Sequence, residues 1–244
     1  MTLALGDRVY VLDATNGVLR SLLADGSDLE TEEDAIAPVD VGASSDATYY
    51  ISSIYDETSE TTRYTLYYRS HQDAAWEAIR SDARGRIWSS SAYGVVYYET
   101  DSSEVEQLYL LRGKEVVPYG AVPPHASYAL ATGNGITVLT VDEDTPANAL
   151  LWLQIGHEAV RQSLPTDGLS PDMSMFRDHV VVSLTEGNNA YVQRYDINGA
   201  IVGRIGVRLG SELVAMDDHY LFHSVTDDWF HWRMLRTKWE IIPF

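Results

Sequence analysis

The sequence predicts an all-β protein made of repeated four-stranded antiparallel sheets. Its clearest unit is residues 180–206, where three β-rich runs are joined by two polar turns, and residues 173–179 form a fourth run before them. The second turn contains Asn198-Gly199, and Asn-Gly between β-rich runs is the strongest short hairpin signal because both residues tolerate positive φ. The four runs together predict one antiparallel meander of about 40 residues.

The same pattern repeats along the chain with a nearly constant period. The predicted third strands end near residues 13, 70, 113, 156, 196 and 237, and after the first interval the spacings are 43, 43, 40 and 41 residues. Such a period, with four strands per repeat and no helical pattern, is typical of a β-propeller, whose stacked sheets cover each other's apolar faces. The alternatives are a β-sandwich, which needs no fixed period, and a solenoid, whose repeats are shorter.

We therefore predict a single β-propeller domain over residues 1–244, with six blades and a short first blade. The blades are expected at residues 1–31, 36–80, 85–120, 126–165, 170–207 and 211–244. Residues 9–23 resemble residues 191–205, so they are expected to be the last two strands of a blade whose earlier part is short or missing. Either this blade is small, or a strand from another chain completes it by β-addition.

Between the first two blades lies an acidic, turn-rich stretch, residues 24–38, which we expect to form a solvated loop. Asp25, Ser27 and Asp28 could in principle bind calcium, but the regular alternation and the distal glutamate of a helix-loop-helix site are absent. The sequence therefore predicts no cofactor, with a divalent cation as the alternative.

Charge is the most unusual feature of the composition. Thirty-six acidic residues stand against 17 basic ones, of which two are lysines, and the formal net charge is −19. Concentrated salt screens the self-repulsion of such a surface, because the Debye length is about 3 Å at 1 M. We expect either a halophilic protein or an ordinary acidic protein from a GC-rich genome. A nucleic-acid partner is disfavoured, because phosphate binding needs a basic footprint.

The sequence also limits location and redox chemistry. It has no cysteine, which excludes disulfides and thiolate metal sites. No run of about 18 apolar residues predicts a membrane span, and the first residues lack the basic and apolar regions of a signal peptide. We leave open a cytoplasmic location and a virion or surface assembly in a high-salt organism.

Two short motifs resemble known propellers. Residues 81–89, SDARGRIWS, resemble the D-x-x-G-x-I-W turn and strand of sensor-type and lactonase-type propellers. Residues 196–199, DING, resemble the third-to-fourth strand turn of NHL and quinoprotein repeats. The chain therefore resembles the broad six-bladed propeller superfamily (YWTD, NHL, TolB-like and gluconolactonase-like repeats), although no repeated Tyr-Trp-Thr-Asp and no intact Asp-box is present.

Three groups of side chains are candidate sites. Acidic residues recur in the loops between second and third strands, and blade symmetry predicts that these loops share one face and form an acidic rim; they are Asp56, Glu57, Asp101, Asp142, Asp144, Asp227 and Asp228. Three histidines near the C-terminus could bind zinc or nickel: His219, His223 and His231. Four tryptophans could stack on sugar rings: Trp76, Trp88, Trp229 and Trp232. Packing and solvation are the alternative interpretations for all three groups.

Catalytic motifs are otherwise missing: the chain has no nucleophile elbow, no His-Glu-x-x-His, no P-loop and no dinucleotide fingerprint. A lactonase-type propeller needs Glu, Asn and Asp around an axial calcium, for which Asn134, Asn188 and Asp217 are candidates. We predict a non-enzymatic module that binds a protein partner or assembles with copies of itself. The alternatives are a glycan-binding or receptor-binding propeller and a metal-dependent lactonase-type hydrolase.

Overall fold

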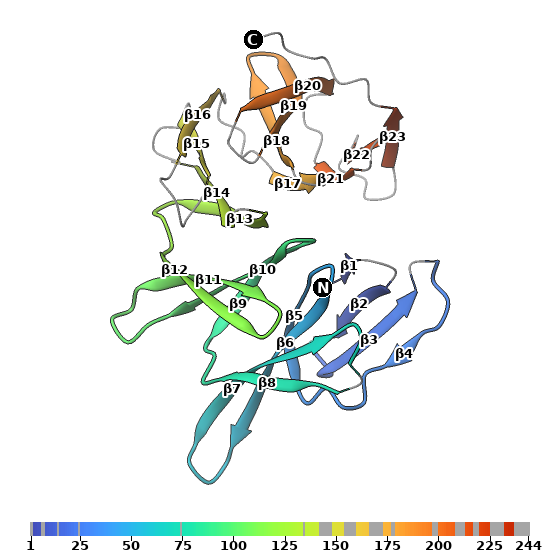
Figure 1. Ribbon diagram of the computed structural model, residues 1–244, viewed down its shortest axis with the longest axis vertical. Coiled ribbons are helices and arrows are strands. Elements are labelled where there is room, and N and C mark those ends of the chain that lie inside the picture. Colours follow the sequence, from blue (N-terminus) through green and yellow to red (C-terminus); the bar gives the residue numbers. More distant parts are fainter. Residues whose placement is uncertain are drawn as a thin grey trace. The chain divides into compact units, whose positions relative to one another are not determined.

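The computed structural model describes most of the first half of the chain and separate strands of the second half. The described residues are 2–5, 8–13, 15–23, 25–73, 75–133, 135–141, 148–153, 160–165, 173–176, 179–196, 200–207, 213–216, 220–224 and 232–236. They divide into two compact units, Met1–Val122 and Pro123–Phe244. Every described element is a β-strand or a turn (Figure 1). No described helix is long and apolar enough to span a membrane.

The first unit contains three antiparallel sheets, each a meander of consecutive strands. The first sheet consists of β1 (Thr2–Leu5), β2 (Arg8–Asp13), β3 (Val18–Leu23) and β4 (Glu30–Thr31). The second consists of β5 (Pro38–Ala43), β6 (Ala47–Asp56), β7 (Thr61–Ser70) and β8 (Glu77–Ser81). The third consists of β9 (Gly85–Ser91), β10 (Gly94–Thr100), β11 (Glu106–Arg112) and β12 (Glu115–Ala121).

The second unit follows the same plan in its described strands. One sheet consists of β13 (Ala126–Thr132), β14 (Gly135–Val141), β15 (Asn148–Leu153) and β16 (Val160–Pro165). The next consists of β17 (Met173–Phe176), β18 (His179–Glu186), β19 (Asn189–Tyr195) and β20 (Ile201–Val207). Three strands form the last described sheet: β21 (Leu213–Met216), β22 (Tyr220–Ser224) and β23 (Trp232–Arg236).

The inner strands are buried because their sheets pack face to face. In β6 the six residues from Ala47 to Ser52 are all buried. Since successive side chains on a strand point to opposite faces, Tyr50 packs with Tyr10 and Leu12 of the first sheet. Tyr49 packs with Tyr97 of the third sheet in the opposite direction. The run from Ala47 to Ser52 has no exposed residue because the second sheet is covered on both faces at this position.

In the second unit the same logic joins two neighbouring sheets. Leu130 and Leu139 contribute to one apolar cluster with Val180, Val182 and Tyr195. Tyr195 is completely buried, and its hydroxyl accepts a hydrogen bond from the amide of Gln193 at 2.6 Å. The buried phenol is thereby satisfied, as a buried polar group requires.

The strand assignment predicted for the first sheet is wrong. Val9–Leu23 was expected to hold the third and fourth strands, but β2 and β3 are the second and third strands of their sheet. The fourth strand is β4, a two-residue strand within the acidic stretch that was expected to be a loop. The first sheet is short, as predicted, because its outer strands have only four and two residues. The described strands therefore give this sheet four strands without a contribution from another chain.

The acidic stretch is held to its sheet by arginine side chains. Arg8 forms ion pairs with Asp28 and Glu30, each at 3.2 Å, and it donates a hydrogen bond to Ser21 at 3.0 Å. Further along, Glu32 pairs with Arg69 of β7 at 2.7 Å, and both side chains are largely buried. These contacts explain why a segment without apolar alternation still pairs with β3.

Candidate functional site

The acidic side chains at two hairpin tips are turn caps. Asp56 accepts hydrogen bonds from the backbone N–H of Thr58 at 2.9 Å and from Arg63 at 2.9 Å. Asp101 accepts from the N–H groups of Ser103 at 2.8 Å and Val105 at 3.1 Å. Both carboxylates therefore close their own turns, a common role for Asp in loops.

The other residues of the predicted rim are either exposed or lie outside the described part of the chain. Glu57 is exposed beside Asp56. Four members of the predicted rim lie outside the described residues: Asp142, Asp144, Asp227 and Asp228. A common acidic face therefore stays a prediction.

We expect the hydrogen bonds that close the turn at Asp101 to weaken when its carboxylate is protonated. The N–H groups of Val105 and Ser103 lower the pKa of Asp101 below the ordinary value of 3.8. The stabilisation of the turn is complete above that value, and it is lost as the pH falls through the lower pKa of the folded state. NMR should show the amide protons of Ser103 and Val105 shifting together, with a midpoint below 3.8. In Asp101→Asn this titration should vanish, and a wild-type midpoint above 3.8 would contradict the assignment.

Of the predicted sugar-stacking residues, Trp76 is partly buried and packs against the core. Its ring contacts Tyr50 edge-on, with centroids 4.7 Å apart, and the Arg69 guanidinium lies 4.2 Å from its centroid on the face. It packs against the buried cluster between the first and second sheets. Trp88 contacts Tyr98 with ring centroids 5.4 Å apart, and because Tyr97, the neighbour of Tyr98 in β10, faces the second sheet, this contact lies on the opposite side of the third sheet. The two rings therefore do not converge.

For the remaining predicted aromatic and metal-binding residues, the sites stay predictions. Trp229, His219 and His231 lie outside the described residues, and so do the side chains of Trp232 in β23 and His223 in β22. Within the described part of the chain, no group of three or more histidine or acidic side chains is arranged to hold a metal ion.

The carboxylates considered for calcium in the acidic stretch have protein partners. Asp25 accepts hydrogen bonds from the backbone N–H and the hydroxyl of Ser27, at 2.9 and 2.6 Å. Asp28 pairs with Arg8. The lactonase candidates Asn134 and Asp217 lie outside the described residues, and Asn188 is exposed at the turn between β18 and β19.

A hollow in the first unit lies at the base of a projecting hairpin. Strands β6 and β7 extend beyond their neighbours, because β5 pairs only as far as Ser52 and β8 only as far as Thr65. We call the two-stranded ribbon beyond these points, residues 53–64, the arm (Figure 1). The hollow has a volume of about 820 Å³, and its walls come from the arm, the start of β5 and the start of β9.

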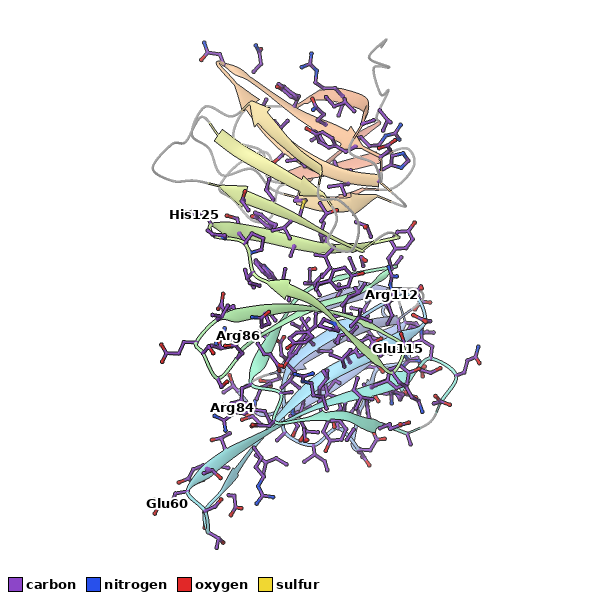
Figure 2. All side chains as sticks on the ribbon, turned by 60° about the vertical axis from the view of Figure 1, so that its left-hand side comes forward. Glu60, Arg84, Arg86, Arg112, Glu115 and His125 are labelled. Carbon is purple, nitrogen blue, oxygen red and sulfur yellow. The ribbon has the colours of Figure 1, made fainter. Side chains whose placement is uncertain are left out.

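The walls of the hollow are rich in hydroxyl and charged groups. Ser53, Thr61, Thr62 and Tyr64 line it from the arm. Figure 2 shows Glu60 at the tip of the arm and Arg84 near its base. The facing wall consists of Val39, Asp40, Arg84, Gly85 and Arg86. A polar ligand is the kind that such a lining can bind.

Asp40 is fixed at the wall by two backbone groups. Its carboxylate accepts hydrogen bonds from the N–H of Ile87 at 2.8 Å and of Val41 at 3.0 Å. Burial raises the pKa of Asp40, although these N–H groups and the nearby Arg86 oppose the shift. A carboxyl group with a pKa raised by burial in a hollow is typical of functional sites, although structural groups show the same shift.

The two arginines are the most exposed charges of the hollow. Arg84 donates from Nε to Asp82 at 2.8 Å, and both side chains are 67% exposed. Arg86 is exposed, and its guanidinium makes no hydrogen bond or ion pair with any described residue. The hollow thus presents two guanidinium groups on a chain that is strongly acidic overall.

The turn before β9 positions these arginines. Asp82 adopts a positive φ of 58°, and the N–H of Ala83 donates to the carbonyl of Tyr64 in β7 at 3.2 Å. Ala83 is fully buried, so Arg84 emerges where the chain leaves the second sheet. In the sequence, this segment indicated only a fold motif. A signal was nevertheless present in the sequence. Arg84 and Arg86 lie within three residues of each other, although the chain has only 17 basic residues against 36 acidic ones, and this could have indicated a binding site.

A second, smaller hollow of about 300 Å³ lies beside the acidic stretch. Its lining includes Arg8, Glu30, Glu32 and Arg69, which pair with one another or with Asp28. These charges are already compensated, so this hollow is a weaker candidate for ligand binding.

Comparisons with known proteins identify the fold. No family model matches the sequence, and no curated protein matches it either. Among solved structures, an acylaminoacyl peptidase from Pyrococcus horikoshii is similar with a TM-score of 0.58 and 10% identity over 91% of this chain and 42% of that one. A prolyl endopeptidase is similar with a TM-score of 0.57 and 14% identity over 89% of this chain and 37% of that one.

The third similar structure is itself a propeller domain. The β-propeller domain of the Trilobed protease from Pyrococcus furiosus, described as having an open velcro topology, matches with a TM-score of 0.55 and 9% identity over 83% of this chain and 69% of that one. At these identities the similarities show the fold alone. The chain has a β-propeller fold, as predicted, and it spans less than half of the two peptidase chains. The number of blades stays a prediction.

Proposed function

We propose that this β-propeller is a non-enzymatic interaction module that binds a macromolecular partner, or a second copy of itself, through the arm. One observation carries the proposal. The arm projects from its sheet and exposes two adjacent large apolar side chains, Ile54 at 44% and Tyr55 at 59%. Two large apolar side chains exposed on one short projecting ribbon, one on each face, favour an interaction surface, whereas a single exposed one is ordinary.

The geometry of the arm adds support. Its strands have no flanking strand on either side in the described part of the chain, so each edge offers backbone groups to a partner. Exposed strand edges of this kind are a common basis for pairing with another chain. The two apolar side chains lie on opposite faces of the ribbon, which suits a partner that wraps around it.

The other predicted functions have less support. The sugar-binding hypothesis depends on Trp76 and Trp88, whose described contacts are with protein rings, and on tryptophans outside the described residues. The lactonase hypothesis depends mainly on Asn134 and Asp217, which also lie outside the described residues. The peptidase activity of the similar structures is a property of chains more than twice as long, and no described residue leads us to propose it here.

We expect that the double variant Ile54→Ser, Tyr55→Ser will lose association while its fold is unchanged, because both side chains are exposed. Light scattering after size exclusion, in 0.1 and 2 M KCl, tests self-association. A photo-crosslinking amino acid at position 55, used in the source cells, tests for a partner and should give one dominant adduct.

The matched control places the same crosslinker at Leu29, which is 64% exposed in the acidic stretch away from the arm. It should give no dominant adduct. A protein that is monomeric in both salt concentrations and gives the same diffuse crosslinks from both positions would contradict the proposal.

A further inference from the structure

The edge of the arm next to the hollow has a free donor and a free acceptor in strand geometry. The carbonyl of Tyr64 accepts from Ala83, and the N–H of Ser53, its partner across the ladder, donates to Ala37 at 3.0 Å. Backbone groups alternate in direction along an antiparallel strand. The N–H and C=O of Thr62 therefore also point away from β6, where no described strand meets them. An extended segment could pair with β7 at this position, in line with β8.

The arginines lie where such a segment would pass. Ala83 is the last residue whose backbone bonds to β7, and Arg84 follows it directly. Thr61, Thr62, Arg84 and Arg86 all line the same hollow. Guanidinium groups bind carboxylates with two parallel hydrogen bonds, which fix the orientation of the pair as well as its affinity.

We infer that this hollow binds an extended acidic segment of a partner protein, which adds to the β7 edge at Thr62 and places a carboxylate against Arg84 and Arg86. The inference rests on the proposed function and names the chemistry of the partner. The backbone groups at Thr62 favour a peptide over a small acid or a glycan, because an extended peptide supplies an N–H and a C=O in the geometry of a neighbouring strand.

The net charge of −19 does not prevent this binding at moderate salt. The Debye length is about 8 Å at 0.15 M, so distant carboxylates are screened while groups in contact are screened much less. The carboxylate nearest the hollow on the wall, Asp40, is occupied by two backbone N–H groups. Asp82 takes only the Nε of Arg84, which leaves the terminal amino groups of that guanidinium to a ligand.

Fluorescence anisotropy with a labelled octapeptide of alternating Glu and Thr tests the inference at 0.15 M KCl. The wild-type chain should bind it about tenfold more tightly than the same peptide with Gln in place of Glu. In Arg84→Gln, Arg86→Gln this preference should disappear. The matched control is Arg63→Gln, since Arg63 is 73% exposed on the same arm but lies outside the lining of the hollow. It should keep the preference.

A second pair of variants tests the strand addition. Thr62→Pro removes the outward N–H, which an edge strand tolerates, and it should weaken binding of the Glu peptide at least fivefold, whereas Thr62→Val should not. Amide exchange at Thr62 should also slow when the peptide is added, a readout that needs no variant. Circular dichroism checks that each variant remains folded.

Several outcomes would overturn the inference. One is that the Glu peptide does not bind at 1 mM, and another is that the Glu and Gln peptides bind equally tightly. A third is that free glutarate binds as tightly as the Glu peptide while Thr62→Pro leaves the affinity for the peptide unchanged. The last would identify a small-acid site. None of these results bears on the crosslinking and light-scattering tests at Ile54 and Tyr55, so failure here is distinguishable from failure of the proposed function.

Discussion

Replacing Arg80 with methionine is expected to lower the free energy of unfolding by about 3 kcal/mol. Arg80 in β8 forms an ion pair with Glu99 in β10, whose side chain is only 10% exposed. Glu99 also accepts a hydrogen bond from the Tyr97 hydroxyl at 2.7 Å, and burial, followed by this contact, raises the pKa of Tyr97. Without the guanidinium, the buried carboxylate keeps only neutral donors, the hydroxyl groups of Tyr97 and Tyr109. Urea denaturation followed by tryptophan fluorescence measures the loss.

Two further variants distinguish this pair, in which the carboxylate is buried and the Arg80 side chain is 34% exposed, from ordinary surface charges. Arg63→Met removes the exposed pair between Arg63 and Asp56 and should change stability by less than about 1 kcal/mol. Glu99→Gln combined with Arg80→Met should be less harmful than the two single changes added together, because no buried charge is then left alone. Additive effects, or an Arg80→Met variant as stable as Arg63→Met, would show that the pair is not the support we describe.

A comparable loss, again about 3 kcal/mol, is expected for Gly85→Ala. Gly85 lies opposite Glu99 in the β9–β10 ladder. A Cβ at this position would overlap the carbonyl oxygen of Tyr98 and lie 2.8 Å from both the Cβ of Glu99 and the Cε2 of Tyr97. A backbone oxygen within a ladder cannot move aside as a flexible side chain can, so β9 must shift away from β10. Denaturant unfolding of the variant should show a lower midpoint with an unchanged slope.

The matched glycine is Gly206 in β20, where an added Cβ meets no atom within 4 Å. Gly206→Ala should leave stability within about 0.5 kcal/mol of the wild type. If Gly85→Ala is tolerated equally well, the close approach of β9 and β10 is not a requirement of the fold.

The fold was largely predictable because strand-forming runs and polar turns alternate along the sequence. Third strands were predicted to end near Ser70, Gly113 and Asp196, and β7, β11 and β19 end at Ser70, Arg112 and Tyr195. The first sheet was assigned wrongly because β4 has two exposed polar residues and no apolar alternation. Its place depends on Arg8, more than 20 residues away in the chain, which a local pattern does not reveal.

The candidate site was not predictable by the same means. Asp40 is held at the wall of the hollow by a hydrogen bond from the N–H of Ile87, which lies 47 residues later in the chain. The arm forms because β6 and β7 are longer than the strands that flank them. Neither fact has a signature in the sequence. The acidic hairpin tips did attract attention, but Asp56 and Asp101 bond to the N–H groups of their own turns. Asp is frequent in turns for this reason, so composition alone could not separate a rim from a set of caps.

The consecutive order of strands in every described sheet has a consequence for biosynthesis. Each sheet can form as soon as its own residues have left the ribosome, since it does not wait for a strand encoded far downstream. Low sequence separation between paired strands also favours fast folding. One face of β6 is covered by the third sheet, which is synthesised later. The nascent chain therefore exposes Tyr49 and Ile51 until the third sheet has folded against them.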